Sequence, residues 1–489
     1  MIVSSQKNAN PDWPLYGLIF ASLLSCVPLW LVDYLPSIDL PQHAAQVAVM
    51  LNYGDVDSGY QDIFRMNWFT PYLFGYGILY LLGLVLPLSI AAKLLLSISF
   101  IATLFLSRAL LQQYGSDKNL AWLIIPINYS FAFYWGFFTF IVSIPFFLLY
   151  LLAVHRYLQA PTRKQGIILG IGSIGLFFSH FILFGLAMLI AALQTFFRYD
   201  IKQYRLYLHY FTAAPIVIAW FVKTMTSEQS GTSTVWNLGF YRIPQIFSYI
   251  IGMQERWPYV IVGIMMVVLP FIIGGRLTRL KWKWAPVIIL LLIFFFVPML
   301  MSGVLFVYER VVILLYIFYL LLFEFKTPLN FLKSSFAALF ALALMVMVLM
   351  KFIAFDQENA GFKDLINAMP VGKRVLFMVF KTRSSEFAYH PIYLNFPAWY
   401  QVEKGGVVDF NFANLYPVVV RFRDDKKPKF TLATLPKYFD WNKHDGDMYD
   451  YILIRSEHDV QQALFRENAY KVRLEKRVGL WWLYKNIQH

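Results

Sequence analysis

Long apolar runs separated by short polar segments fill the first 351 residues of the chain. Many of these runs reach about 20 residues, which is enough for an α-helix to cross the hydrocarbon core of a bilayer. Run length and loop charge together predict about eleven transmembrane helices. We expect these helices near 14–32, 88–111, 120–134, 137–155, 166–179, 181–197, 206–222, 257–275, 285–301, 311–323 and 335–351.

The stretch from Trp68 to Pro87 is also apolar, but it is rich in Gly, Pro and Tyr. We predict a re-entrant or surface helix here rather than a full span, because a full span would invert every later loop. With this assignment, fifteen Lys and Arg and four acidic residues fall in the inner segments 1–13, 108–119, 155–166, 198–205, 276–284 and 324–334. The outer segments 33–67, 223–256 and 302–310 hold five Lys and Arg against eight acidic residues. The positive-inside rule therefore predicts a cytoplasmic N-terminus in a multi-pass protein of the cell membrane.

The composition changes after Lys351. Residues 352–489 make up 28% of the chain but hold 36 of its 70 charged residues. Helical patterns at 362–369 and 457–468 alternate with strand patterns at 374–380, 449–455, 470–478 and 480–485, which is typical of an α/β domain. The sequence therefore predicts a transmembrane domain over 1–351, which includes an outer loop at 33–87, and a soluble extracytoplasmic α/β domain over 352–489.

The overall composition agrees with a membrane protein. Hydrophobic residues make up 59% of the chain and charged residues only 14%. A net charge of +14 would indicate nucleic acid as the partner of a soluble protein. Here the bias of basic residues toward inner loops explains the charge, so we expect a lipid bilayer and no nucleic acid as the partner. The single cysteine, Cys26, excludes an internal disulfide framework.

The polar stretch from Asp33 to Arg65 separates the first two apolar runs and carries five aspartates. Within it, Asp39 suits the N-cap of a helix and Pro41 suits the first turn. His43 follows Asp39 by four residues, so a helix would place both side chains on one face. A carboxylate and an imidazole at a membrane surface are suited to proton transfer. The alternative is that Asp39 only caps the helix and His43 is a polar residue of the interface.

Other ionisable residues are predicted to collect on the same side of the membrane as Asp39. As candidate substrate-binding residues we single out Arg65, Lys93, His180, Arg256, Glu309 and Arg310. Each has a structural alternative when taken alone: a lysine can reach the headgroups, a histidine can be satisfied inside the bundle, and Glu-Arg neighbours can pair. Taken together, a carboxylate near several cations at headgroup depth suits a lipid substrate that bears phosphate.

These features resemble the GT-C superfamily of integral membrane glycosyltransferases, which includes aminoarabinose transferases and protein O-mannosyltransferases. The acidic residue that follows the first span in that family is matched by Asp39, and its Pro-Leu-Tyr-like apolar stretch by Thr70–Phe74. Lys93 stands where many members have an arginine, and Tyr308–Arg310 resembles the arginine that opens a late span. A C-terminal extracytoplasmic α/β domain is also common in the family. The first loop here departs from the family in lacking a paired Asp-Glu.

The resemblance implies transfer of a sugar from a polyprenyl-phosphate carrier to a glycan, lipid or protein acceptor on the outer face. Asp39 would act as the general base or would orient the acceptor, and Arg310, Arg256, Lys93 and Arg65 are candidates for binding the carrier phosphate. His43 would bind phosphate or join Asp39 around a divalent metal, which some members use and others do not; two ligands at one helical spacing leave that point open.

Two other functions fit a polytopic membrane protein. A transporter or flippase would need charges along a path between the two sides, whereas the middles of the predicted helices are nearly free of charge. A non-catalytic assembly factor would not depend on Asp39. For a transferase we expect Asp39, Lys93 and Arg310 to line one cavity beneath the C-terminal domain.

Overall fold

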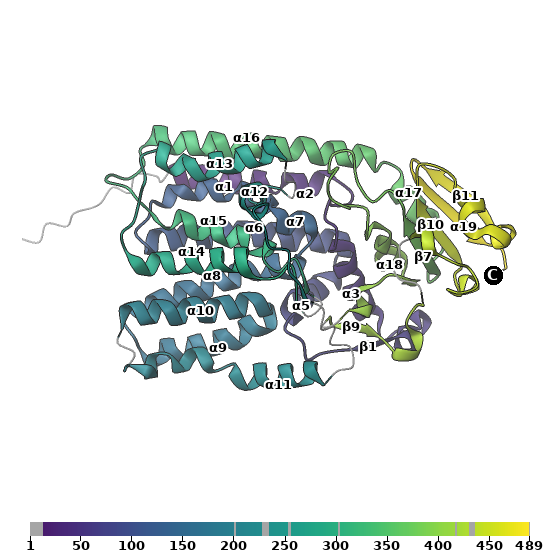
Figure 1. Cartoon of the computed structure of the whole chain (residues 1–489), viewed down its shortest axis with the longest axis horizontal. Coiled ribbons are helices and arrows are strands. Elements are labelled where there is room, and N and C mark those ends of the chain that lie inside the picture. The colour runs from purple at the N-terminus through teal and green to yellow at the C-terminus, as the bar shows by residue number, and fades with distance from the viewer. Residues whose placement is uncertain are drawn as a thin grey trace, which may run out of the picture.

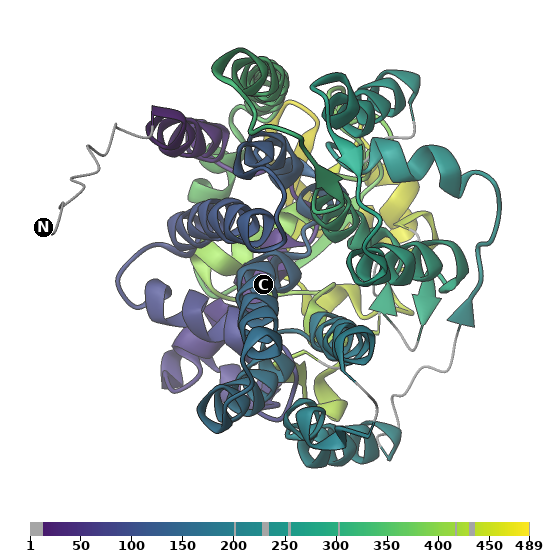
Figure 2. The same cartoon turned by 90° about the vertical axis from the view of Figure 1, so that its left-hand side faces the viewer.

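The protein is a bundle of long helices with a small sheet-containing domain at one end (Figure 1). This computed structural model describes residues 13–199, 202–226, 234–252, 256–301, 304–415, 418–429 and 436–488. The first twelve residues and parts of the predicted loop 223–256 therefore lie outside the described residues. Figure 2 looks along the bundle and shows most of its helices end-on.

The bundle helices follow the predicted apolar runs closely. They are α1 (Trp13–Ser25), α2 (Val27–Leu31), α6 (Leu88–Gln113), α8 (Phe138–Gln159), α9 (Arg163–Ser179), α10 (Phe181–Arg198), α11 (Ala214–Met225), α13 (Trp257–Ile272), α14 (Lys281–Phe296), α15 (Val312–Leu320) and α16 (Phe331–Glu358). Among the described residues, five helical segments are long and apolar enough to cross a membrane: Leu88–Gln113, Phe138–Gln159, Phe181–Arg198, Leu208–Met225 and Phe331–Glu358. Shorter apolar helices accompany them, which indicates a multi-pass membrane protein.

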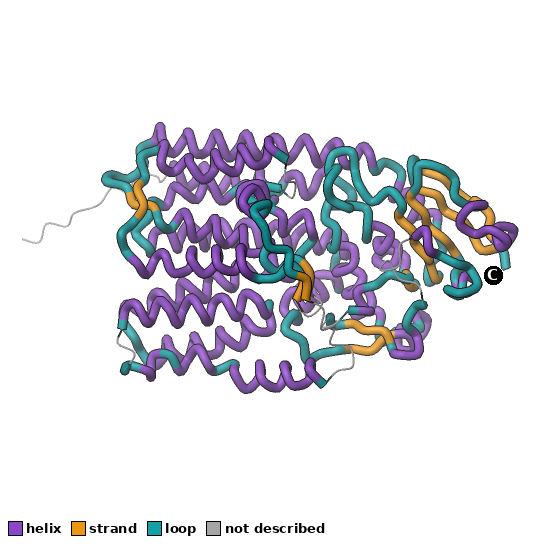
Figure 3. The backbone as a smooth tube through the Cα atoms, viewed as in Figure 1, coloured by secondary structure: helices purple, strands orange, loops and turns teal. Residues whose placement is uncertain are grey.

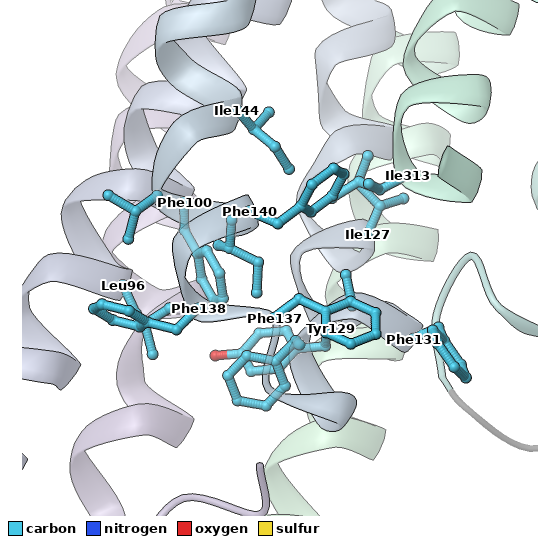
Figure 4. Packing of buried hydrophobic residues seen from close by; sticks show 14 of the residues in the cluster. Leu96, Phe100, Ile127, Tyr129, Phe131, Phe137, Phe138, Phe140, Ile144 and Ile313 are labelled. Carbon is cyan, nitrogen blue, oxygen red and sulfur yellow. The ribbon is translucent and has the colours of Figure 1, made fainter. Parts of the chain in front are cut away.

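The predicted third span, 120–134, is not an α-helix. It consists of two 3₁₀ helices, η2 (Lys118–Ile124) and η3 (Pro126–Tyr129), followed by the short helix α7 (Phe131–Trp135). Pro126 has no N–H to donate and interrupts the α-helical hydrogen bonding, so the segment divides there. Its side chains from Leu120 to Tyr134 are buried against α6 and α16. Figure 4 shows Tyr129, Phe131 and Phe137 in this aromatic core.

The apolar stretch 68–87 forms the short helix α5 (Leu73–Gly83). Eleven residues of α-helix span about 16 Å, roughly half the hydrocarbon thickness. This helix packs on α3 (Leu40–Asn52), α6 and α8 at the end of the bundle that faces the C-terminal domain. Its length agrees with a re-entrant or surface helix rather than a full span.

The C-terminal domain contains a mixed five-stranded sheet in the order β11-β12-β10-β7-β8. The parallel strands are β7 (Arg374–Val379), β8 (Val407–Val408) and β10 (Tyr451–Arg455), and the antiparallel strands are β11 (Val472–Val478) and β12 (Trp481–Asn486). Three short helices accompany the sheet, namely α17 (Phe362–Ala368), α18 (Trp399–Lys404) and α19 (Gln461–Phe465). The predicted strands are present, whereas the predicted helix at 457–468 is only five residues of α-helix and then continues as a 3₁₀ helix, η12 (Arg466–Lys471).

The loop 33–87 and the C-terminal domain pack together (Figure 1). Strand β1 (Phe64–Met66) of the loop pairs antiparallel with β9 (Val420–Phe422) of the domain. On α3, Gln42 donates to the carbonyl of Phe410 and accepts from the N–H of Phe412. The loop before α3 is tied in by Tyr34, whose hydroxyl donates to Glu403 over 2.7 Å. The domain is therefore fixed to the loop that carries Asp39.

Several short elements complete the described chain. They are α4 (Tyr60–Ile63), α12 (Arg242–Ser248), β2 (Thr234–Val235), β3 (Arg276–Leu277), β4 (Leu300–Met301), β5 (Val304–Leu305) and β6 (Phe323–Glu324). The pair β3–β6 lies at the end of the bundle opposite the C-terminal domain (Figure 3). The basic segment 276–284 thus lies away from the domain, as the charge distribution predicts.

Candidate active site

The backbone around Asp39 is held by the turn that follows α7. The N–H of Ile38 donates to the carbonyl of Tyr134 over 2.9 Å, and the N–H of Asp39 donates to the carbonyl of Trp135 over 3.0 Å. Gly136 ends α7 with φ +89°. A Cβ at Gly136 would lie 2.5 Å from the backbone nitrogen of Asp39, so only glycine permits this approach.

The side chain of Asp39 does not cap the helix that begins beside it. Asp39 occupies the N-cap position of α3, but its carboxylate makes no capping hydrogen bond. Instead, Oδ1 accepts from the Nδ2 of Asn395 in the C-terminal domain over 2.8 Å, and the Trp135 side chain also hydrogen-bonds to the carboxylate. Burial raises the pKa of Asp39 to about 7, while Arg310 and these two donors act to lower it. The carboxylate is thus tuned to exchange a proton near neutral pH.

Arg310 is the cation that faces this carboxylate. It lies in the 3₁₀ helix η6 (Glu309–Val311), immediately before α15. Its guanidinium stacks on the ring of Phe137 at 3.7 Å from the centroid, and it donates to the carbonyls of Phe306 and Leu305 over 3.2 and 3.0 Å. Stacking and two hydrogen bonds hold the planar group in one orientation while its positive charge acts on Asp39.

His43 lies on α3 one turn after Asp39 and is already occupied by hydrogen bonds. Its Nδ1 is 2.7 Å from the hydroxyl of Tyr76, and its ring also hydrogen-bonds to the backbone of Gly136. Burial and the charge of Arg310 lower the pKa of His43 to about 3, so the ring stays neutral. His43 therefore supports the site through these hydrogen bonds and does not carry a proton to or from Asp39.

The side chains near Asp39 do not fit a metal site. Within the described part of the chain, no group of three or more His, Cys, Asp or Glu residues is placed to hold a metal ion. Asp39 and His43 would supply two ligands, and the ring of His43 is engaged as described. We therefore derive no step through a metal.

His180 and Glu309 are buried polar groups beside Arg310. The ring of His180 packs edge-on against Tyr72 and Phe140, and it is within electrostatic range of Arg310 and His43. Neither of its ring nitrogens has a hydrogen-bond partner among the described residues, and the same holds for Oε2 of Glu309. Buried polar atoms in proteins are normally paired, so these atoms are available to a ligand.

Two of the predicted phosphate-binding residues lie elsewhere. Arg65, on β1, is solvent-exposed and pairs with the exposed Asp424 of the C-terminal domain over 3.4 Å. The ammonium of Lys93 donates to the carbonyl of Val32 over 2.5 Å at the end of the first span. Its charged neighbours are Asp33, Asp356 and Lys363 rather than Asp39. The expectation that Lys93 lines one cavity with Asp39 and Arg310 is therefore wrong, because Lys93 packs against the end of the first span.

Arg256 lines a separate cavity of about 330 Å³ between α13, α16 and the C-terminal domain. Its guanidinium stacks on Tyr389 at 4.3 Å and donates to the hydroxyl of that residue over 2.8 Å. Lys351 lies in the same cavity and donates to the carbonyl of Glu386 over 3.0 Å. The sequence marked Lys351 only as the end of the last span, so this second cation was missed.

Sequence reasoning also missed neutral residues that shape the site. Trp135 and Asn395 bind the carboxylate directly, and Tyr76 binds His43. Tyr72 contacts the ring of His180 and interacts electrostatically with Arg310. None of them carries a charge, and nothing in the local pattern distinguishes them from the many other aromatic and amide residues of the chain. The segment Thr70–Phe74, which resembles a family motif, was the one signal that pointed toward Tyr72.

Comparison with known proteins identifies a shared fold. No protein-family model matches the sequence, and no curated protein matches it. A solved structure does match: that of ArnT from Cupriavidus metallidurans bound to undecaprenyl phosphate, with a TM-score of 0.56 and 11% sequence identity. The match covers 97% of this chain and 98% of that chain. The chain therefore shares its overall fold with that protein over nearly its whole length.

Proposed function

We propose that this protein is a membrane glycosyltransferase that moves a sugar from a polyprenyl-phosphate carrier to an acceptor on the outer face of the cell membrane. The observation that carries the proposal is the half-buried carboxylate of Asp39 near the half-buried guanidinium of Arg310, at the joint between the helix bundle and the C-terminal domain. The likeness in fold to ArnT, whose structure holds undecaprenyl phosphate, supports the same class of donor.

The chemistry assigns one role to each charge. Asp39 accepts the proton of an acceptor hydroxyl as its oxygen attacks the anomeric carbon of the donor sugar. The bond between that carbon and the carrier phosphate oxygen breaks, and the phosphate leaves with the electron pair. Arg310 stabilises the negative charge that develops on the phosphate, which a guanidinium does well in a water-poor site.

Further groups suit the remaining parts of such a substrate. The unpaired polar atoms of His180 and Glu309 are available to sugar hydroxyls. An apolar cavity of about 140 Å³ is lined by Val312 and Leu315 of α15, directly after Arg310, and suits part of an isoprenoid chain. Arg256 with Lys351 offers a second cationic cavity for a phosphate at headgroup depth. Arg65 and Lys93 have structural partners and take no part in the proposal.

The test is complementation of a deletion strain, with carrier-dependent change of the strain's glycans as the readout. Asp39→Asn keeps the shape of the side chain but removes the base, so we expect transfer to fall by about 10²–10⁴-fold. The matched control is Asp62→Asn, which changes an exposed aspartate of the same loop and should behave as wild type.

Protein level and membrane insertion are measured for both variants by immunoblotting of the membrane fraction. Full complementation by Asp39→Asn would contradict the proposal and favour a non-catalytic assembly factor. Movement of a lipid-linked substrate across the membrane without any change in its glycosidic bond would contradict it in favour of a flippase.

A further inference from the structure

Asn395 is the residue through which the C-terminal domain reaches the candidate base. It lies in the loop between β7 and α18, directly before the 3₁₀ helix η7 (Phe396–Ala398). Its side chain is buried, with 2% of the residue exposed, and its Nδ2 donates to Oδ1 of Asp39 over 2.8 Å. The two residues are 356 positions apart in the sequence.

The rest of this loop is fixed to the bundle and to the sheet. The ring of Tyr393 lies 3.6 Å below the guanidinium of Arg455 on β10. Arg455 in turn pairs with Glu358, the last residue of α16, over 3.0 Å, and this pair is largely buried. Asn395 lies two residues from this fixed contact. The position of its amide, and therefore its hydrogen bond to Asp39, is fixed as well.

The two ends of the Asn395 amide differ in their hydrogen bonding. Asn411 uses both ends of its amide, since its Nδ2 donates to Gln401 and its Oδ1 accepts from the N–H of Ala413. Gln42 also uses both ends. In Asn395, Nδ2 donates to Asp39 and Oδ1 has no hydrogen-bond partner among the described residues, as is also true of Nε2 of Gln401.

We propose that Asn395 is a positioning residue for Asp39, so that the C-terminal domain completes the active site instead of only covering it. The inference rests on the proposed function, since it assigns Asn395 a role through the base of that reaction. The amide N–H fixes which carboxylate oxygen faces the acceptor and favours the ionised carboxylate. Its free carbonyl lies on the same amide, available to the acceptor hydroxyl.

The groups that act on Asp39 come from each element packed against it. Arg310 on η6 is positive, His43 on α3 is neutral, and Tyr76 on α5 is a phenol, while Trp135 after α7 and Asn395 are uncharged donors. Loss of the Asn395 donor removes a group that stabilises the charged carboxylate. The sign of the effect is therefore fixed: the titration midpoint of Asp39 must rise.

The test measures that midpoint directly. Dicyclohexylcarbodiimide reacts with protonated carboxyl groups in apolar surroundings, and mass spectrometry of peptides quantifies the modification of Asp39 in the full-length protein at each pH. We expect the midpoint to rise by about half to one pH unit in Asn395→Ala. It should rise further in Asn395→Asp, where a second carboxylate faces the first. Asn411→Ala is the matched control and should keep the wild-type midpoint.

The transfer assay gives a second readout for the same variants. Near pH 7 we expect a roughly two- to sixfold slower transfer in Asn395→Ala, with the loss partly recovered at higher pH, as a raised pKa requires. An unchanged midpoint in Asn395→Ala, or an equal shift in Asn411→Ala, would overturn the positioning role. The proposed function fails by a different result: it is contradicted only if Asp39→Asn remains active in transfer, whatever the titration midpoints are.

Discussion

The loop 33–87 meets the C-terminal domain at two places that look alike in the sequence. At one, Asp39 lies near Arg310 and Asn395, and the carboxylate is half-buried. At the other, Arg65 lies opposite Asp424, with side-chain exposures of 45% and 66%. Both places combine an aspartate with an arginine, but the side chains at the first are half-buried and those at the second are exposed.

The difference indicates that burial of the charged groups, rather than their presence, distinguishes the candidate active site from an ion pair that only attaches two surfaces. The attraction between unit charges is several times stronger at a partly buried site than in bulk water. Desolvation also brings the pKa of Asp39 to about 7, into the range where a carboxylate can take up a proton in a reaction. An exposed pair such as Arg65–Asp424 gains little and is screened by salt.

Of the changes at these two places, removal of the Arg310 side chain should slow transfer the most. In Arg310→Gln the departing phosphate loses its cation, so we expect transfer to fall by about 10²–10³-fold. Arg310→Lys keeps the charge but loses the planar stacking on Phe137 and two directed hydrogen bonds, and should recover only a small part of the loss. Initial rates with membrane vesicles test both variants, and a near wild-type rate in Arg310→Gln would remove Arg310 from the mechanism.

Gly136→Ala should disturb the site around Asp39 through the backbone alone. The new Cβ would lie 2.5 Å from the nitrogen of Asp39, on a residue whose φ is +89°. We expect a loss of about 2–4 kcal/mol in the free energy of unfolding, together with slower transfer. Thermal unfolding in detergent measures the first effect. Gly77→Ala is the control, since a Cβ there meets nothing within 4 Å, and an equal shift in both variants would argue against a special role for this turn.

Arg65→Gln should have the smallest effect. The exposed pair with Asp424 is lost, but the β1–β9 hydrogen bonds remain, so we expect transfer to stay within about twofold of wild type. Any small effect should vanish at high salt. A loss of transfer as large as that in Arg310→Gln would mean that the exposed pair matters to the reaction as much as Asp39 and Arg310 do.

Much of the fold could be predicted from the sequence. Apolar runs and loop charge predict most bundle helices within a few residues, and α6 begins at Leu88 as expected. The strands of the C-terminal domain follow their β-branched and aromatic patterns. The third predicted span failed because hydrophobicity reports burial and not helix type, and the segment is 3₁₀ on both sides of the break at Pro126.

The candidate site could be predicted only in part. Asp39 and Arg310 stood out because a charge at a membrane boundary is costly and therefore noticeable. Arg65 and Lys93 looked equivalent, because their partners Asp424 and Val32 depend on how the chain folds back. Asn395 gave no signal at all: it is uncharged and reaches Asp39 only through the packing of a distant domain. Local sequence patterns do not reveal long-range contacts of this kind.

We propose that Asp39 works as a base because its half-buried carboxylate titrates near neutral pH. The direct measurement is the rate of sugar transfer in vesicles between about pH 5.5 and 8.5, for wild type and Asp39→Asn. A raised pKa means that Asp39 is protonated, and unable to accept a proton, below about pH 7. We therefore predict a wild-type rate that rises with pH through a midpoint near 7, and a slow Asp39→Asn variant that lacks this step. An Asp39→Asn variant that keeps the wild-type rate and the same rise would contradict the account.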